Sequence, residues 1–224
     1  MISYGIKLFK SEAVSLSAIR NKEDAAINVL VFLKSMYNSN YHDPNEPFYG
    51  FYYPDLHRLV WGDEDKSIHS LSIPWELRID ECMRQGIPNH KDIEWKYEYY
   101  DELLYLFREV KEHDILNGSI EGFIDIYSEM LESFNINSII DQHNLWVLFT
   151  SLYSYEPGYI RYDYDPENAN GHVHPCYHLD INYCKRGTYK IGLWENMTID
   201  GFTDFLNLST DCYYASKIGG LRNR

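Results

Sequence analysis

Two short segments in the last third of this 224-residue chain alternate between apolar and polar side chains. Residues 159–164 have the sequence Tyr-Ile-Arg-Tyr-Asp-Tyr, and residues 176–181 have the sequence Cys-Tyr-His-Leu-Asp-Ile. Successive side chains of a strand point to opposite faces, so the alternation predicts two strands, each with one apolar and one polar face. We expect them to pair antiparallel with both apolar faces buried, because a slip of one residue would expose Leu179 to water. That register brings four polar side chains onto one face: Arg161, Asp163, His178 and Asp180.

The middle of the chain follows a helical period instead. Apolar side chains recur every three or four residues in three stretches, which predicts helices over residues 22–37, 92–113 and 120–134. The second and third stretches are separated by a short turn, so they are expected to form an antiparallel helical hairpin. A last helix is predicted to begin at Thr198, because threonine is a favourable N-cap residue, and to run toward Tyr213.

The remaining segments are predicted to supply strands. Residues 145–155 form a continuous apolar and aromatic run, which we interpret as a buried strand, and residues 189–194 form a further short strand. Residues 48–61 are aromatic and partly alternating, and residues 2–9 are a short strand or an entry arm. Because helices and strands are segregated along the chain, the pattern predicts an α+β fold. We expect a single domain, residues 1–224, with a small antiparallel sheet, mainly from the C-terminal third, packed against a helical N-terminal and middle region.

The chain is strongly acidic, with 34 Asp and Glu residues against 20 Lys and Arg residues and a formal net charge of −14. A field of this sign repels nucleic-acid backbones and anionic membranes at long range, so contact with a nucleic acid needs a locally basic pocket. No apolar run approaches the roughly 20 residues of a membrane-spanning helix, and the N-terminus lacks the features of a signal peptide. These features predict a cytoplasmic protein. The four cysteines are scattered along the chain and are expected to be free thiols. They are Cys82, Cys176, Cys184 and Cys212.

The connection between the two alternating segments, residues 165–175, is long for a hairpin and adds His172 and His174. Long loops within compact domains are uncommon and often functional. Taken one at a time, the polar residues have ordinary explanations, such as a surface ion pair or solvated loop histidines. Their convergence on one patch with His178 favours a functional site.

The same region resembles an uncharacterised bacterial family of unknown function. The resemblance depends on Arg161-Tyr162-Asp163, on residues 174–178 (His-Pro-Cys-Tyr-His) and on the C-terminal helix, and it covers about the last third of the chain. This arrangement also looks like that of toxins from some bacterial toxin–antitoxin pairs. The resemblance therefore implies a bacterial conflict protein of the toxin or phage-defence type. Asp180 stands where the family pattern has a further histidine, and the family supplies no established activity.

We expect the patch to act on RNA or a nucleotide as a phosphodiester hydrolase that needs no cofactor. Histidine titrates near neutral pH, so His174 and His178 are the expected proton-transfer pair. The planar fork of Arg161 suits a phosphate group, and Asp163 or Asp180 would orient one imidazole ring. Three further side chains are expected to contact the substrate: His172, Tyr162 and Asp180.

Two alternatives stay open. In the first, zinc or manganese is held by three histidines and one carboxylate. These ligands would be His172, His174 and His178 with Asp163 or Asp165. Their spacing matches no standard metal motif. In the second, the chain is a non-enzymatic, immunity- or antitoxin-like protein that captures a basic partner through acidic residues in 63–65 and 94–102. A positive pocket around Arg161 favours the enzyme, whereas a continuous acidic face favours the binding protein. The sequence has no Walker, HExxH or Gly-x-Ser-x-Gly motif.

Overall fold

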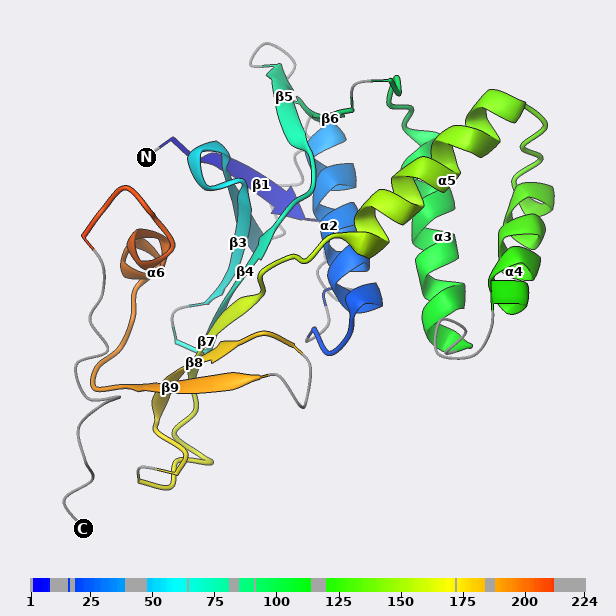
Figure 1. Ribbon diagram of the computed structural model, residues 1–224. Coiled ribbons are helices and arrows are strands. Elements are labelled where there is room, and N and C mark those ends of the chain that lie inside the picture. The colour runs from blue at the N-terminus through cyan, green and yellow to red at the C-terminus, as the bar shows by residue number, and fades with distance from the viewer. Residues whose placement is uncertain are drawn as a thin grey trace.

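The computed structural model describes residues 2–8, 16, 19–38, 48–63, 65–80, 85–90, 92–113, 120–171, 173–183 and 188–211. Within these residues the fold is α+β, as predicted, with one seven-stranded sheet, one two-stranded sheet and packed helices (Figure 1). The large sheet has the strand order β1-β2-β3-β4-β7-β8-β9, and every neighbouring pair is antiparallel. Its strands are β1 (Tyr4–Leu8), β2 (Phe48–Tyr53), β3 (Arg58–Asp63), β4 (Ser67–Ser72), β7 (Ile160–Tyr164), β8 (Tyr177–Ile181) and β9 (Tyr189–Leu193). The small sheet pairs β5 (Glu76–Asp80) with β6 (Gln85–Asn89).

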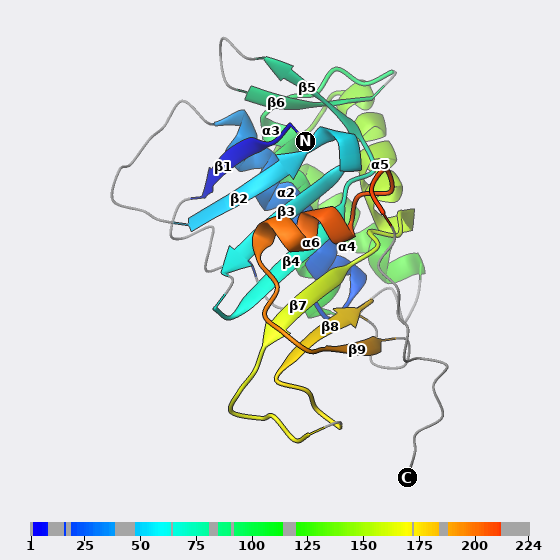
Figure 2. The same cartoon turned by 90° about the vertical axis from the view of Figure 1, so that its left-hand side faces the viewer.

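Most of the helices form a layer on one side of the large sheet, and α6 lies on the other side (Figure 2). The helix against the sheet is α2, whose Phe32 ring lies 5.0 Å from the ring of Trp61 in β3. In the part of the chain that the structure describes, no helix is long and apolar enough to span a membrane. The helices are α2 (Lys22–Tyr37), α3 (Glu98–Glu112), α4 (Ile120–Ser133), α5 (Ile139–Ser154) and α6 (Ile199–Phe205), with a 3-10 turn at Pro54–Leu56.

The helices expected from the apolar period are confirmed, with shifted ends. Residues 22–37 form α2 with the predicted bounds, and Asn21 caps it by accepting a hydrogen bond from the backbone N–H of Asp24. The stretch 92–113 becomes the shorter α3, which packs beside α4 as the helical hairpin requires (Figure 1). Thr198 caps α6, which ends at Phe205, while Tyr213 lies outside the described residues.

The expectation that the sheet comes mainly from the C-terminal third is wrong. Four of its seven strands, β1 to β4, lie within the first 72 residues, and β7 joins them by pairing with β4. Residues 48–61 supply β2 and β3, as their alternating pattern allowed. Residues 67–72 carry only two apolar side chains, Ile68 and Leu71, on opposite faces of the strand, so the segment has no clear alternation and was missed.

The interpretation of residues 145–155 as a buried strand is also wrong, because this run is the second half of α5. A continuous apolar run fits a buried strand or a buried helix equally well, so its period does not separate the two. In α5 the buried side chains are Leu145, Leu148, Phe149 and Leu152, the spacing of one helical face. The helix begins at Ser138, whose Oγ accepts a hydrogen bond from the backbone N–H of Asp141.

A second, smaller core lies between the sheet and α6. It is built from side chains of β3, β4, β7 and β8 that point toward Phe202 of α6. Tyr162 and Leu179 are part of it, which confirms that the two alternating segments bury their apolar sets on one face. The polar sets of β7 and β8 consequently lie on the opposite face of the sheet.

Candidate functional site

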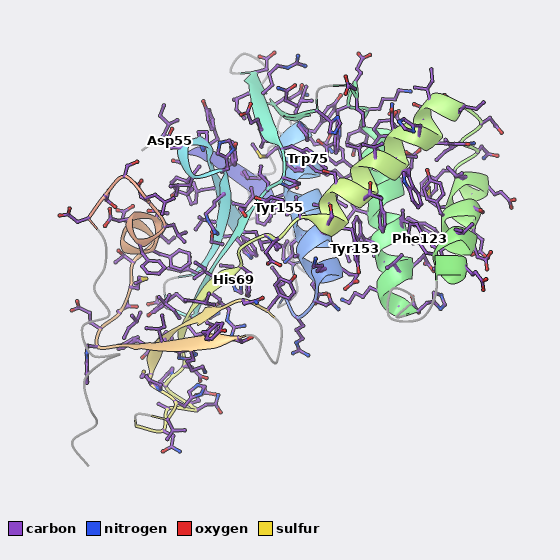
Figure 3. The ribbon with its side chains drawn as sticks, in the orientation of Figure 1. Asp55, His69, Trp75, Phe123, Tyr153 and Tyr155 are labelled. Carbon is purple, nitrogen blue, oxygen red and sulfur yellow. The ribbon has the colours of Figure 1, made fainter. Side chains whose placement is uncertain are left out.

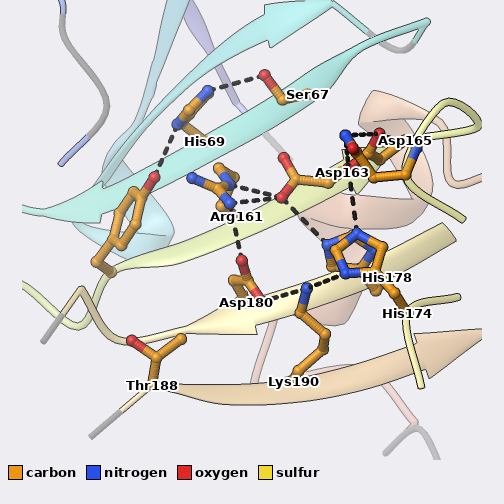
Figure 4. Close-up of polar contacts among 12 residues, drawn as sticks. Ser67, His69, Arg161, Asp163, Asp165, His174, His178, Asp180, Thr188 and Lys190 are labelled. Atoms are coloured by element: carbon orange, nitrogen blue, oxygen red, sulfur yellow. Dashed lines mark hydrogen bonds and ion pairs between the residues drawn. The ribbon is translucent and has the colours of Figure 1, made fainter. Parts of the chain in front are cut away.

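The polar face of β7 and β8 continues across the sheet in two rows of cross-strand neighbours (Figure 4). The predicted antiparallel pairing is confirmed, with Arg161 opposite Asp180 and Asp163 opposite His178. One row consists of Trp61, His69, Arg161, Asp180 and Lys190. The other row consists of Ser67, Asp163, His178 and Gly192.

Arg161 lies between two carboxylates at the centre of this face. Its Nε is 2.8 Å from Oδ2 of Asp163, and its Nη2 is 2.7 Å from Oδ2 of Asp180. Both ion pairs are partly buried, so solvent screens them less than it screens an exposed pair. A phosphate group would have to displace a carboxylate to reach this guanidinium. The arginine therefore does not form the free positive pocket expected for direct phosphate binding.

His178 is 1% exposed, yet it is surrounded by polar groups rather than by the apolar core. Its Nδ1 lies 2.9 Å from the carbonyl oxygen of Pro175, and its Nε2 lies 3.3 Å from Oδ2 of Asp163. Both ring nitrogens thus face hydrogen-bond acceptors. This geometry fixes the ring and turns it away from solvent.

Gly192 allows the 165–175 connection to close over β9. A Cβ atom at this position would lie 2.7 Å from Cγ of Pro175, which is too close for any side chain. The connection can therefore lie against β9, with the Pro175 carbonyl within reach of His178. The sequence signal for this contact is a single glycine within a strand, which marks a close approach of another segment.

His174 is the accessible histidine of the site. Its side chain is about one-third exposed, its Nε2 lies 3.1 Å from Oδ2 of Asp165, and its Nδ1 lies 3.3 Å from Nζ of Lys190. Hydrogen bonds from Asn168 and from His174 lower the pKa of Asp165, so this carboxyl group is ionised at neutral pH. The ring of His174 also stands edge-on to that of His178, with 4.8 Å between centroids. An ionised carboxylate, an imidazole and an ammonium group thus lie in one line at the surface.

His69 extends the polar face to β4 and was missed in the sequence. Its ring stacks on Trp61 at 5.2 Å, its Nδ1 lies 2.9 Å from Oη of Tyr159, and its Nε2 lies 3.0 Å from Oγ of Ser67. Burial, together with the positive charge of Arg161, lowers the pKa of His69 to about 3. This histidine is therefore neutral and acts as a structural link between the aromatic core and Arg161.

Three ligand-type residues of this face lie close enough to share a metal ion. One ligand atom each from Asp163, His178 and Asp180 lies within 4.8 Å of the others. However, Arg161 already bonds both carboxylates and neutralises much of their charge. A divalent cation would have to compete with this guanidinium, so the arrangement favours ion pairing over metal binding.

The metal set expected from the sequence is not assembled among the described residues. His174 faces Asp165 and Lys190, whereas Asp163 faces His178 and Arg161. His172 lies outside the described residues, as do Cys82, Cys184 and Cys212. Cys176 has a free thiol, as expected.

Tyr162, which we expected to contact the substrate, does not lie on the polar face. This side chain is fully buried on the opposite face of β7, where its Oη bonds the amide oxygen of Asn196. The alternation of the strand separates it from Arg161 and Asp163, its neighbours in sequence.

A cavity of about 310 Å³ lies elsewhere, between β1, the C-terminal half of α2 and the β5–β6 sheet. Its described lining includes Lys7, Ser35 and Gln85 but no histidine or carboxylate. It therefore does not offer the acid–base groups of the polar face. Comparisons with protein-family models, with curated protein sequences and with solved structures found no match for this chain.

Proposed function

We propose that the polar face of β7 to β9 is an acid–base site for a phosphate-containing substrate, either RNA or a nucleotide. The observation that carries this proposal is the line of Asp165, His174 and Lys190, because it is the part of the face that a substrate can reach. An imidazole held by a carboxylate and placed beside a cation is suited to moving a proton next to a phosphate.

The roles differ from those expected on the sequence alone. His174 accepts the proton of the attacking hydroxyl or water as the new P–O bond forms. Lys190 offsets the charge of the phosphate and donates a proton to the leaving oxygen as the old P–O bond breaks. Asp165 orients the His174 ring, whereas Arg161 and Asp163 form the frame that supports His178 behind it.

Exposed aromatic side chains at both ends of β9 support a substrate that carries a base. Tyr189 begins the strand and is 70% exposed, and Trp194 follows its last residue and is 76% exposed. Exposed aromatic rings are the usual stacking partners of unpaired bases in proteins that bind single-stranded nucleic acids. The alternation of β9 places Lys190 on the face of Asp180 and Tyr189 on the opposite face, so Trp194, directly after the strand, is the ring proposed to stack on a base beside this cation.

The proposal is tested by incubating the protein with single-stranded RNA and with a panel of nucleotides and analysing the products by chromatography. His174→Ala and Lys190→Ala should each reduce cleavage by about 10²–10⁴-fold, the usual contribution of a general acid or base. His113→Ala is the matched control, since His113 is an exposed histidine at the end of α3. It should retain full activity.

Chelators should leave the activity unchanged, whereas inhibition that zinc or manganese reverses would favour the metal alternative. The toxin or phage-defence role belongs to the same proposal. Expression of the wild-type chain in a bacterial host should slow growth or restrict phage, and expression of His174→Ala should do neither. A wild-type protein that neither cleaves nor binds any substrate of the panel would overturn the proposal.

A further inference from the structure

Exposed apolar side chains gather on α4, α5 and the turn between them. Ten large apolar side chains are exposed in the described part of the chain, and five of them lie between residues 124 and 146. Ile139 and Ile140, at the start of α5, are 81% and 72% exposed. We call this surface the α4–α5 face, and its apolar members are Ile124, Phe134, Ile139, Ile140 and Trp146.

The charged side chains that α4 and α5 themselves contribute are acidic, and Lys96 reaches this surface only at Asp141, at the start of α5. No Lys or Arg occurs between residues 112 and 160, a stretch that includes α4, α5 and both of their ends. The charged and exposed members of α4 are all carboxylates: Glu121, Asp125, Glu129 and Glu132. None of these four takes part in an ion pair within the described residues, so their charge is not neutralised by neighbours. The surface is therefore acidic and apolar at once.

An aromatic contact holds the two helices of this face in place. The ring of Trp146 in α5 lies 5.4 Å from that of Phe123 and 5.5 Å from that of Tyr127, both in α4. Figure 3 shows Phe123 between α3 and α4, in the outermost part of the helical layer. Trp146 is still 41% exposed, so part of its ring is accessible to solvent between the two helices. An exposed apolar surface on packed helices is a usual receptor for the apolar side of an amphipathic helix.

We infer that the α4–α5 face binds a basic amphipathic helix of a partner protein. The apolar side of such a helix would cover the isoleucines and Trp146, and its Lys and Arg side chains would meet the carboxylates of α4. The net negative charge of the chain argues against three other possible binding partners. A second copy of this chain, with a net charge of −14, a nucleic acid and an anionic membrane would all be repelled.

This surface differs from the one that the acidic composition suggested. Residues 94–102 include Glu102, which is buried, and the acidic segment 63–65 contains Glu64, which lies outside the described residues. The inference does not depend on the proposed acid–base function, because it concerns another layer of the fold (Figure 1).

The probe is a fluorescein-labelled synthetic peptide of about 18 residues, a helix long enough to span about 27 Å, with Leu and Trp on one side and Lys on the other. Binding to the full chain is measured by fluorescence anisotropy. A peptide with Glu in place of Lys and a scrambled peptide of unchanged composition are the controls. We expect saturable binding of the Lys peptide alone, weakened at least tenfold between about 0.05 and 0.5 M NaCl.

Variants of the chain identify the surface that binds. The double variant Ile139→Ser/Ile140→Ser and the charge reversal Glu121→Lys/Asp125→Lys should each weaken binding at least tenfold. The matched controls are Leu208→Ser, an exposed apolar residue beyond α6, and Glu76→Lys, an exposed carboxylate of β5. Both should bind the Lys peptide as the wild type does.

Circular dichroism checks that every variant is folded; the replaced side chains are exposed, so the fold should persist. Equal binding of the Lys and scrambled peptides, or an equal loss in the control variants, would overturn the inference, since either result means non-specific attraction to an acidic protein. Absence of binding at low salt would also overturn it.

Discussion

Glu102 offers the sharpest test of the energetics of the helical layer. It lies on α3, is 7% exposed, and its Oε2 has no hydrogen-bond partner among the described residues. Burial, reinforced by the negative charges of Asp141 and Glu98, raises the pKa of Glu102 from 4.5 to about 7. The folded protein therefore binds this proton more tightly than the unfolded chain does, and ionisation above that pKa destabilises the fold.

The sign and size of the effect follow from this difference. A raised pKa for a carboxyl group means that its contribution is most favourable below pH 4.5 and is lost as the pH rises toward 7. Each pKa unit corresponds to about 1.4 kcal/mol, so the cost of ionisation reaches about 3 kcal/mol at pH 8. Glu102→Gln removes the charge and keeps the shape. It should therefore raise the free energy of unfolding by about 2–3 kcal/mol at pH 8 and by much less near pH 4.5.

Urea unfolding followed by tryptophan fluorescence measures this difference at both pH values. Glu112→Gln is the matched control, because Glu112 lies on the same helix, is exposed and is not among the charges that raise the pKa of Glu102. Its effect should stay within about 0.5 kcal/mol at either pH, as for most surface substitutions. An equal change in stability at both pH values for Glu102→Gln would refute the reasoning. The cost of ionising a buried carboxyl group exists only at a pH at which the group is ionised.

Three further substitutions test the frame around the site. Asp163→Asn removes the charge that Arg161 and His178 share, while Arg161 keeps Asp180, and should lower the stability by about 1–3 kcal/mol, measured by urea unfolding. Gly192→Ala places a Cβ against Pro175 and should cost about 1–3 kcal/mol, seen as a lower Tm together with reduced cleavage. Ser138→Ala removes the N-cap of α5 and should cost about 1 kcal/mol by thermal unfolding with no loss of cleavage.

The polar face of β7 and β8 could be predicted because alternation and the burial of Leu179 fix which side chains share a face. They do not fix the exact partner, since a slip of two residues keeps the same faces; the structure places Asp163 opposite His178. The same reasoning did not say which groups would neutralise one another. The bonds of Arg161 to two carboxylates depend on side-chain directions across three strands, and a sequence pattern does not contain them.

The parts of the fold that were missed have a common cause. Residues 145–155 were assigned from an apolar run whose period fits two structures, and only the packing of α5 on α3 and α4 decides between them. β4 was missed because it is short and four of its six residues are polar, although it joins the N-terminal strands to β7. Long-range pairing of this kind makes one sheet from two distant parts of the chain.

The two proposed surfaces respond to the acidity of the chain in opposite ways. At the α4–α5 face the net charge of −14 adds to the local carboxylates and attracts a basic helix. At β9 the same charge repels an approaching phosphate, and among the described residues the exposed cation that opposes this repulsion is Lys190, whose Nζ also lies 3.8 Å from Oδ1 of Asp180. Salt screens the distant charges more than it screens a contact within a few ångströms. Added salt therefore weakens the repulsion of a phosphate at β9 and weakens the attraction of a basic helix at the α4–α5 face. An acidic chain can therefore bind a phosphate only at a cation held within contact distance, as Lys190 is beside His174.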